Sequence, residues 1–286
     1  MVELSIIIVS YNNMEVLTNC LKSIEKYNDL GDKCEVIVVE QSPAEDIYNY
    51  LLQNFPAVKV VRAENRGFGA GNNIGASKAE GRYLLFLNPD TVLLEQIGKY
   101  AVSKFNNDKK LGLFGVQLLD KDKKKNSSFD CIIPFGFASK LIYKTCFRMN
   151  CFLSRCMYIQ GADMFIRADL FNDIGRFDEA IFMYCEESDL CIRIRKKGFR
   201  TAYFKDKKIV HLQGACSSEN YKTTFKKQLL SFKYFCSKHG YRFDRIMQRE
   251  KKYQIIKSKI AKKISAESCK IASCKIQAIN DALNEK

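Results

Sequence analysis

Residues 65–90 of the chain read NRGFGAGNNIGASKAEGRYLLFLNPD. The stretch follows a β-branched run at residues 58–61 and places four glycines within its first eleven residues. A second apolar run, residues 83–87, leads into the polar turn Asn88-Pro89-Asp90. A short strand, a glycine-rich loop that opens a helix and a second buried strand are typical of a βαβ unit. The stretch therefore predicts an α/β fold with parallel strands.

The same alternation of strand and helix precedes this stretch. Residues 4–9 and 35–39 are short, β-branched apolar runs, and apolar residues recur at helical spacing over residues 16–24 and 48–52. Such sheets bind their ligands at the carboxyl ends of the strands. We therefore expect a mostly parallel central sheet with helices on both faces, and a binding site just beyond the strand ends.

The pattern also predicts two domains. Residues 129–158 are rich in aromatic residues and cysteine without a clear period, whereas a strand is expected again at residues 162–166. From residue 224 onward the pattern is helical to the end. We expect an α/β domain over residues 1–221 and a basic helical C-terminal extension over residues 222–286.

Most of the net charge of +15 lies in this extension. Residues 222–286 carry 17 lysines and arginines against 5 acidic residues, whereas residues 1–221 carry 30 against 27. A basic segment beside a nearly neutral domain indicates a polyanionic partner, such as a membrane surface or a nucleic acid, or serves solubility alone. The sequence shows neither a signal-peptide pattern nor an apolar run long enough to span a bilayer, so a cytoplasmic location is expected.

Twelve cysteines are present, but no two of them form a Cys-x-x-Cys pair. A zinc site or a redox motif is therefore disfavoured, and free thiols are expected.

The glycine loop has two interpretations. Main-chain amides at a helix N-terminus favour phosphate, glycine allows close approach to the backbone, and Arg66 adds a cation for a diphosphate. Alternatively, the glycines serve only a tight turn and close packing. The loop alone does not distinguish these interpretations.

Two further segments are candidates for a metal site. A carboxylate such as Asp90, at the end of a buried strand, suits a hard divalent cation that bridges substrate phosphates, although Asn-Pro is also a common turn. His211, one of two histidines, follows a short apolar pair and is either a neutral imidazole ligand or a structural residue.

Glu186, Glu187 and Asp189 place three carboxylates within one helical turn. Their mutual repulsion is expected to raise at least one pKa, which suits a general base. Acidic residues also interact favourably with a helix N-terminus, and the two roles are compatible. The sequence contains no Ser-His-Asp or Cys-His pattern and no Walker-type Gly-Lys-Ser/Thr motif.

In their order along the chain, these motifs resemble family-2 glycosyltransferases, most closely the bacterial rhamnosyltransferase-like branch. The resemblance covers residues 4–218 and rests on segments that are individually weak signals. These segments are Ser10-Tyr11-Asn12, residues 35–42, Asn65-Arg66-Gly67, Gly71-Asn72-Asn73-x-Gly75, Asn88-Pro89-Asp90, Gly161-Ala162, Phe177-Asp178-Glu179, residues 184–191 and His211.

The resemblance implies a GT-A fold, which is Rossmann-like, with residues 1–118 as its nucleotide-sugar half and residues 119–221 as its acceptor and base half. It implies an NDP-sugar donor (dTDP-rhamnose or a UDP-hexose), Mn²⁺ or Mg²⁺ as cofactor, and a cell-surface polysaccharide or lipid-linked glycan as acceptor. It also implies inversion at the anomeric carbon.

The resemblance further assigns roles to individual residues. Those expected to bind the donor are Ser10, Tyr11, Asn12, Glu40, Arg66, Gly67, Asn72, Asn88 and Asp90. Those expected to hold the metal are Asp90 and His211. Those expected in catalysis are Glu187 as general base, flanked by Glu186 and Asp189. Two positions depart from the family: Glu40 replaces the usual Asp, which leaves nucleotide choice open, and Asn88 replaces an Asp found in many relatives.

Residues 245–286 combine isoleucines at helical spacing with lysines on the remaining faces. Such a cationic amphipathic helix suits the anionic cytoplasmic leaflet, which would place the protein peripherally at the inner face of the membrane. Alternatively, the helix packs on the catalytic domain or pairs with a second copy to form a homodimer.

Three other functions are weighed against this interpretation. A nucleotidyltransferase of similar fold is disfavoured because Ser10-Tyr11-Asn12-Asn13 stands where those enzymes have a glycine-rich loop with Arg and Lys. Nucleic-acid binding is not expected because the basic tail lacks interleaved aromatic residues for base stacking. An inactive scaffolding member is disfavoured by the presence of Asp90, Glu187 and His211.

Overall fold

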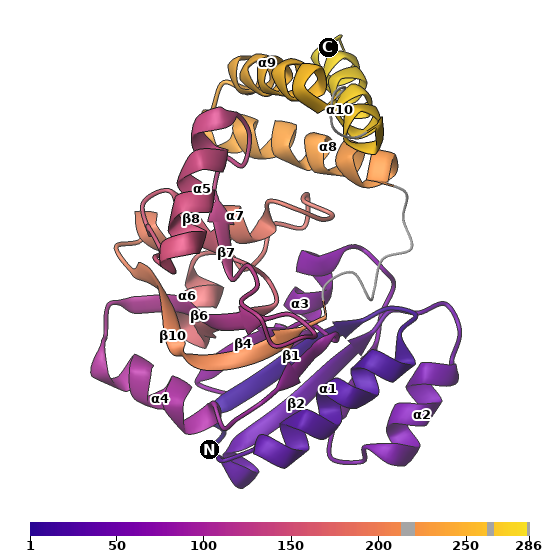
Figure 1. Cartoon of the computed structure of the whole chain (residues 1–286). Coiled ribbons are helices and arrows are strands. Elements are labelled where there is room, and N and C mark those ends of the chain that lie inside the picture. The colour runs from indigo at the N-terminus through magenta and orange to yellow at the C-terminus, as the bar shows by residue number, and fades with distance from the viewer. Residues whose placement is uncertain (213–220, 262–265, 285–286) are drawn as a thin grey trace. The chain divides into compact units, whose positions relative to one another are not determined.

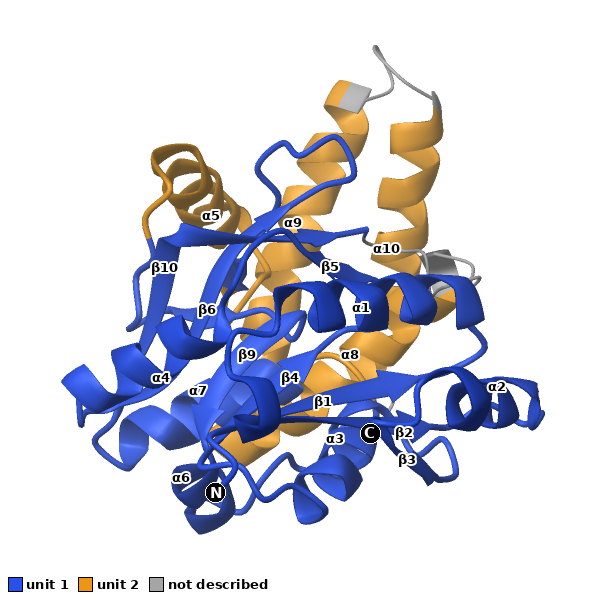
Figure 2. Ribbon diagram, turned by 90° about the horizontal axis from the view of Figure 1, so that it is seen from below, with its two compact units in different colours: residues 1–130, 152–182, 186–217 blue, residues 131–151, 183–185, 218–286 orange. Residues whose placement is uncertain are grey.

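The computed structural model describes residues 1–212, 221–261 and 266–284 (Figure 1). These residues divide into two compact units (Figure 2). The first holds the described residues of 1–130, 152–182 and 186–217, and the second those of 131–151, 183–185 and 218–286. The boundary predicted at residue 221 adjoins residues 213–220, which lie outside the described residues.

The first unit is built on an eight-stranded sheet with the order β3-β2-β1-β4-β9-β6-β10-β5. Its strands are β1 (Leu4–Ser10), β2 (Cys34–Glu40), β3 (Lys59–Arg62), β4 (Tyr83–Leu87), β5 (Thr91–Leu93), β6 (Leu111–Leu119), β9 (Asp163–Arg167) and β10 (Arg200–His211). A separate pair is formed by β7 (Phe129–Cys131) and β8 (Met157–Ile159). Four of the seven neighbouring pairs in the large sheet are parallel, and β9 and β5 make the antiparallel ones.

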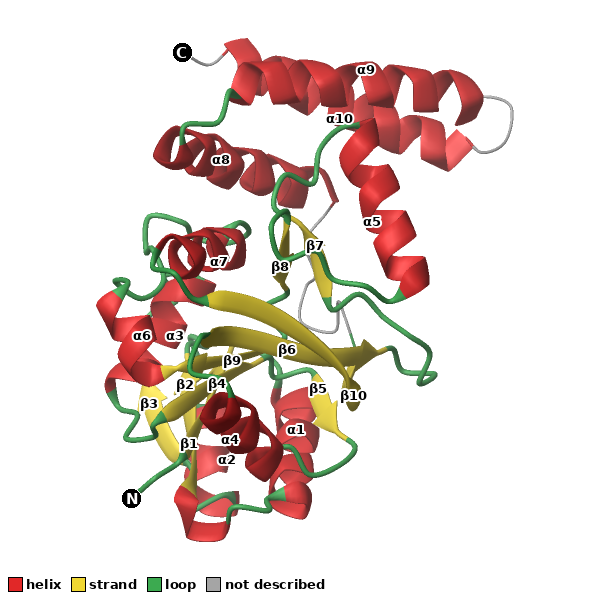
Figure 3. Cartoon of the chain, turned by 90° about the vertical axis from the view of Figure 1, so that its left-hand side faces the viewer, coloured by secondary structure: helices red, strands yellow, loops and turns green. Residues whose placement is uncertain are grey.

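Helices cover both faces of this sheet (Figure 3). One face carries α1 (Met14–Tyr27), α2 (Asp46–Asn54) and α4 (Gly98–Asn107), and the other carries α3 (Phe68–Ser77), α6 (Ala168–Asp173) and α7 (Glu186–Lys196). The side chains of β1 show why both faces are covered: successive side chains of a strand point to opposite faces of the sheet, and in β1 both sets are mainly apolar. Ile6 and Ile8 join the core with α1, whereas Ile7 contacts α3 where Gly75 leaves room for it. The predicted α/β fold is confirmed.

The core between β1, β4, β6 and α1 is fully apolar. Ile8, Leu17, Leu85 and Phe114 are each at most 1% exposed. Phe114 also stacks on Phe165 of β9 with ring centroids 4.6 Å apart. Burying each of these side chains contributes roughly 1.5–3 kcal/mol, so the sheet is a rigid platform for the loops at its edges.

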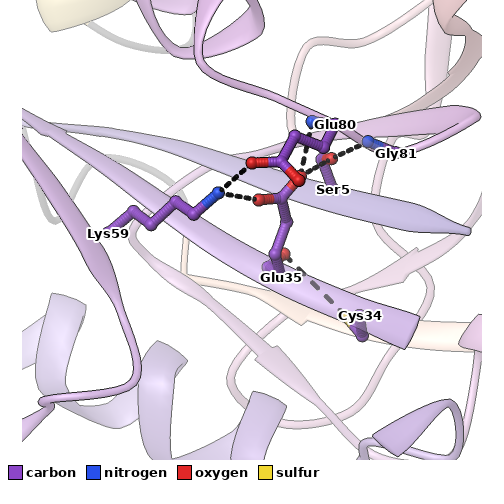
Figure 4. A network of polar contacts seen from close by, with 6 residues as sticks. All are labelled: Ser5, Cys34, Glu35, Lys59, Glu80 and Gly81. Carbon is purple, nitrogen blue, oxygen red and sulfur yellow. Dashed lines mark hydrogen bonds and ion pairs between the residues drawn. The ribbon is translucent and has the colours of Figure 1, made fainter. Parts of the chain in front are cut away.

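A polar network ties the amino ends of β1, β2 and β3 together (Figure 4). Ser5 Oγ donates to Glu35 Oε1 at 2.5 Å, and Lys59 Nζ lies 2.7 Å from Glu35 Oε2 and 2.9 Å from Glu80 Oε1. Burial by itself raises the pKa of Glu35, but the hydrogen bonds from Lys59, Ser5 and the Glu80 amide outweigh it and hold the pKa below its usual range. The network therefore fixes the strand ends opposite those that carry the predicted site.

The second unit contains α5 (Phe137–Met149), α8 (Tyr221–His239), α9 (Phe243–Ala261) and α10 (Ala266–Asn284), with α9 and α10 in close contact. Glu250 of α9 is 1% exposed and accepts hydrogen bonds from the Gly136 amide and from Gln254 Nε2, both at 2.6 Å. Lys140 Nζ lies 2.6 Å from the same carboxylate. These bonds hold the loop before α5 against α9.

The predicted run of helix after residue 224 is confirmed for its described residues, which belong mainly to α8, α9 and α10. Residues 262–265 of the predicted amphipathic tail lie outside the described residues. Helix α5 was not predicted, because Phe137, Leu141 and Met149 are exposed and blur the apolar periodicity. In the part of the chain that the structure describes, no helix combines the length and apolar character needed to cross a membrane.

Candidate active site

The predicted motifs meet at one edge of the first unit's sheet. Strands β1, β2 and β4 are parallel, so their carboxyl ends at Ser10, Glu40 and Leu87 lie on the same side. Strand β9 runs antiparallel to β4 and pairs Asp163 with Leu87, which brings the turn before β9 to that side as well. Strand β10 ends there at His211, paired with Thr91. The topology therefore places all five chain segments at the same edge of the sheet.

A pocket of about 510 Å³ lies beyond β1, β2 and β3. It is lined by Tyr11, Gln41, Ser42, Pro43, Arg62, Ala63, Glu64 and Asn65. Tyr11 is 42% exposed and offers a ring face, and Gln41 is held in place by its hydrogen bond to the Glu64 carbonyl at 3.0 Å. A flat aromatic ring beside main-chain and amide groups suits a nucleoside base.

Three residues predicted to face the nucleoside support this pocket without lining it. The Asn12 amide donates to Ser42 Oγ at 2.7 Å, and the Ser42 amide donates to Glu40 Oε1 at 2.6 Å. Glu40 is fully buried, and its Oε2 atom, like Ser10 Oγ, has no hydrogen-bond partner among the described residues. Such buried, unpaired oxygens at a pocket edge are free to accept bonds from a ligand.

The glycines of the loop before α3 are needed for packing. Gly67 has φ +100°, and a Cβ atom there would lie 2.1 Å from the Phe182 carbonyl oxygen. A Cβ atom on Gly75 would lie 2.4 Å from the Ile7 side chain. Both positions exclude any larger residue. The packing interpretation of the loop is thus correct for these two glycines, and a ligand role for the loop stays a prediction.

Arg66 and Asn72, predicted to lie near the donor, are each bonded within the first unit. Arg66 is largely exposed and forms an ion pair with Glu179 at 3.0 Å, while Asn72 is 1% exposed and donates to the Phe68 carbonyl. Asn73 fixes the following loop by bonding the Phe177 carbonyl and Glu179 Oε1. An exposed ion pair contributes roughly 0–1 kcal/mol, so Arg66 can leave Glu179 for a diphosphate at little cost.

Asp90 and His211 lie side by side although 121 positions separate them in the sequence. Asp90 Oδ1 is 3.3 Å from His211 Nε2, and Asn88 Nδ2 is 3.5 Å from the same nitrogen. Asp90 is 4% exposed and His211 is 8% exposed. The Leu212 amide donates to the Asp90 carbonyl at 2.9 Å, which extends the pairing of β10 with β5.

This pair suits a divalent cation. Two ligands of one octahedral ion, each about 2.1 Å from it, lie about 3 Å apart when they are adjacent. A carboxylate oxygen and an imidazole nitrogen are a donor set that Mn²⁺ accepts. Within the described ranges, no group of three or more His, Cys, Asp or Glu residues is placed to hold a metal ion.

The three predicted carboxylates of α7 have different surroundings. Asp189 is fully buried in an ion pair with Arg193, one turn later, at 2.7 Å. Glu186 is 3% exposed, and burial, followed by the charge of Glu187, raises its pKa well above the usual range. Burial likewise raises the pKa of Glu187, with a smaller contribution from Asp130. Glu187 is only partly buried, so it is the member of the cluster that a substrate can reach.

A short chain of contacts leads from Glu187 to the turn that holds Asp90. The Gly161 amide donates to Glu187 Oε1 at 3.2 Å, and the next carbonyl, of Ala162, accepts the Asn88 amide at 3.1 Å. A Cβ atom on Gly161 would lie 3.0 Å from Glu187 Oε1 and 3.1 Å from the Phe68 ring. The glycine therefore lets the base candidate, the start of α3 and the Asn88 turn approach one another.

The family follows from sequence comparison. The model of the family described as glycosyl transferase family 2 matches residues 5–175, which is more than half of the chain. The chain belongs to glycosyl transferase family 2. The predicted family membership is thereby confirmed.

Two relatives of known description are similar over most of this family-2 glycosyltransferase. The rhamnosyltransferase WbbL of Escherichia coli (strain K12) is 28% identical over 263 residues, covering 84% of this chain and 97% of WbbL. The hexosyltransferase Agl10 of low-salt glycan biosynthesis in Haloferax volcanii is 25% identical over 222 residues, covering 74% of this chain and 67% of Agl10.

A solved structure supports the same fold. The mannosyltransferase PcManGT from Pyrobaculum calidifontis, solved in complex with GDP-Man and Mn²⁺, superposes with a TM-score of 0.62 at 14% identity, covering 99% of this chain and 88% of that one. The predicted GT-A fold is confirmed.

Part of the pocket beyond β1, β2 and β3 was not predicted from the sequence. Gln41, Arg62 and Glu64 line it but were not named as donor residues. Gln41 directly follows β2, Arg62 is the last residue of β3 and Glu64 lies just beyond it, so the rule that ligands bind beyond parallel strand ends also covers these positions.

Proposed function

We propose that this glycosyltransferase moves a sugar, with inversion, from an NDP-sugar to a cell-surface polysaccharide or lipid-linked glycan. The observation that carries the proposal is the convergence of a nucleoside-sized pocket, the Asp90–His211 pair and the carboxylate of Glu187 at one edge of the sheet. The similarity to a rhamnosyltransferase and a hexosyltransferase favours dTDP-rhamnose or a UDP-hexose as donor.

Asp90 and His211 would hold Mn²⁺ or Mg²⁺ in the proposed enzyme. A bound divalent cation neutralises charge on the diphosphate as it leaves. Asn88 stays beside this pair through its contact with His211 and is positioned to bond the sugar or ribose. Tyr11 would pack on the base, and the unpaired Glu40 and Ser10 oxygens would accept bonds from the nucleoside.

Glu187 is the general base of the proposed reaction. The acceptor oxygen forms a bond to the anomeric carbon while the bond from that carbon to the diphosphate oxygen breaks, and the hydroxyl proton passes to Glu187. Glu186, the more buried partner, keeps its proton because burial and the neighbouring charge disfavour a second carboxylate. Glu187 then stays ionised, with the Gly161 amide bonded to one oxygen. Asp189 holds Arg193 and fixes the helix.

The reaction can be tested by nuclear magnetic resonance. The full chain is incubated with Mn²⁺, α- or β-linked NDP-sugars and a membrane extract that supplies lipid-linked acceptors. We expect nucleoside diphosphate to accumulate and the new glycosidic bond to have the opposite anomeric configuration to that of the donor. Retention of configuration would refute the inverting mechanism. Release of pyrophosphate in a parallel incubation with a nucleoside triphosphate and a sugar 1-phosphate would indicate a nucleotidyltransferase instead.

Two further predictions concern where the protein is located and whether two copies associate, and neither is part of the proposed reaction. A peripheral location at the inner face of the membrane and pairing of two copies through the C-terminal helix both stay predictions.

A further inference from the structure

The second unit carries a groove of about 800 Å³ between residues 133–139 and helix α9. Its lining includes Phe137, Tyr253, Ile256 and Ile260. Phe137 is 67% exposed, Ile256 is 60% exposed and Ile260 is 57% exposed. Large apolar side chains gathered on an exposed surface mark a binding site, because leaving them in water is unfavourable.

A cationic hollow continues from one end of this groove. Arg245, Arg249 and Lys252, spaced four and three residues apart on α9, line a pocket of about 170 Å³ together with Gln248. Arg249 and Lys252 also line the apolar groove, so the two hollows share a wall. Like charges at this helical spacing repel each other, and an anion between them relieves that repulsion.

Glu250, an acidic residue beside the basic ones on α9, is already paired. It is 1% exposed and bonded to Lys140, Gln254 and the Gly136 amide. The linings of both hollows contain basic, apolar and neutral polar residues and no acidic residue. The surface therefore offers positive charge at one end and hydrocarbon contacts at the other.

We propose that this surface docks the second unit on a membrane rich in anionic lipid. Lipid phosphates bind Arg245, Arg249 and Lys252, while Phe137, Ile256 and Ile260 enter the boundary between headgroups and acyl chains. A nucleic acid would also bind the basic residues, but it has no hydrocarbon chains to contact the apolar side chains at the other end of the surface. A second copy docked through the same face would bring two sets of cations together. The proposal does not depend on the transferase reaction.

Vesicle flotation of the full chain tests this proposal. We expect flotation with phosphatidylcholine vesicles that contain phosphatidylglycerol, and none with pure phosphatidylcholine. Changing Arg245, Arg249 and Lys252 together to glutamine should weaken partition into the vesicles on the order of 100-fold. Each basic residue near an anionic membrane contributes a similar binding free energy, and the variant loses three of these contributions. The matched control changes three exposed lysines of the first unit, Lys22, Lys109 and Lys121, to glutamine and should float like the wild type.

A second set of variants tests whether the apolar side chains contribute to membrane binding. The triple change Phe137→Ser, Ile256→Ser and Ile260→Ser should reduce flotation at least tenfold, since these side chains are exposed and their loss leaves folding intact. Leu52→Ser with Leu153→Ser, also exposed, is the matched control and should not reduce it.

Three results would overturn the proposal: equal flotation with neutral and anionic vesicles, no flotation at all, or flotation unchanged in both triple variants. Duplex DNA binding that is lost in the glutamine variant, with vesicle binding unaffected, would assign the cationic hollow to a nucleic acid. Dimerisation lost in the serine variant, again with vesicle binding unaffected, would assign the groove to a second copy. Sugar transfer in detergent is measured in parallel, so that failure of docking and failure of the proposed reaction are distinguished.

Discussion

Replacing Glu187 by glutamine is expected to lower kcat by roughly 10²–10⁴-fold while leaving the affinity for the nucleotide unchanged. Glutamine keeps the size of the side chain and its contact with the Gly161 amide, but it cannot accept the acceptor's proton. The initial rate of NDP release in the presence of acceptor gives kcat, and calorimetry gives the dissociation constant of the nucleotide. Because only the proton-transfer role is removed, kcat should change and the dissociation constant should not.

The pH dependence of the activity tests the role of Glu187 as general base in a second way. Burial raises the pKa of Glu187, so its ionised, basic form is lost as the pH falls through a value above the usual range for glutamate. Wild-type activity should therefore decline on the acid side of neutrality, and Glu187→Gln should lose that acid limb together with its activity.

Neighbouring carboxylates provide the controls. Glu186→Gln should retain most of its activity, because Glu186 is already neutral in the proposed enzyme. Asp189→Asn should mainly reduce stability, because it breaks a buried ion pair with Arg193. Near-normal transfer by Glu187→Gln, with a large loss in Glu186→Gln, would move the base to Glu186.

Changing Asp90 to alanine is expected to reduce kcat/KM by roughly 100-fold or more, which corresponds to about 3 kcal/mol of transition-state stabilisation. His211→Ala should have a comparable effect, because both residues are proposed to hold one ion. In both variants, activity should need a higher concentration of Mn²⁺ for half saturation. The assay is a metal titration of the rate after treatment with a chelator.

A folding control is needed because Asp90 is buried. Thermal unfolding without ligand should show that each variant remains folded, and Asp122→Ala, an exposed loop change of the same kind, should leave the metal titration unaltered. Wild-type rates that are indifferent to a chelator, or an Asp90→Ala variant with an unchanged metal requirement, would contradict the assignment of this pair.

The parallel half of the fold was predictable from the sequence because its signals are local. The apolar run at residues 83–87 matches β4 residue for residue, and residues 4–9 match β1 to within one residue. Each of these runs is bounded by turn residues, and their burial on both faces explains why they are continuously apolar. Helix α5 was not predictable, because four of its larger apolar side chains, Phe137, Leu141, Ile142 and Met149, are exposed.

The candidate site was predictable in its parts but not in its geometry. The sequence supplied Asp90 and His211 as separate candidates, and only the antiparallel pairing of the three-residue strand β5 with β10 brings them to 3.3 Å. Long-range strand pairing leaves no local mark in a sequence. Likewise, the pattern of three acids in one turn did not rank them, and only the family resemblance favoured Glu187. The Arg193 partner of Asp189 and the Gly161 contact of Glu187 separate them only in three dimensions.

We propose that the first unit binds a nucleoside diphosphate with a divalent cation at the edge where β1, β2 and β4 end. Thermal unfolding with UDP, dTDP or GDP, each with and without Mn²⁺ or Mg²⁺, measures this binding. A ligand at about 100 times its dissociation constant stabilises the native state by about 2.7 kcal/mol, so one nucleotide should raise Tm by on the order of 5 °C, and only with metal present. Unchanged Tm values for all three nucleotides in the presence of metal would contradict the claim.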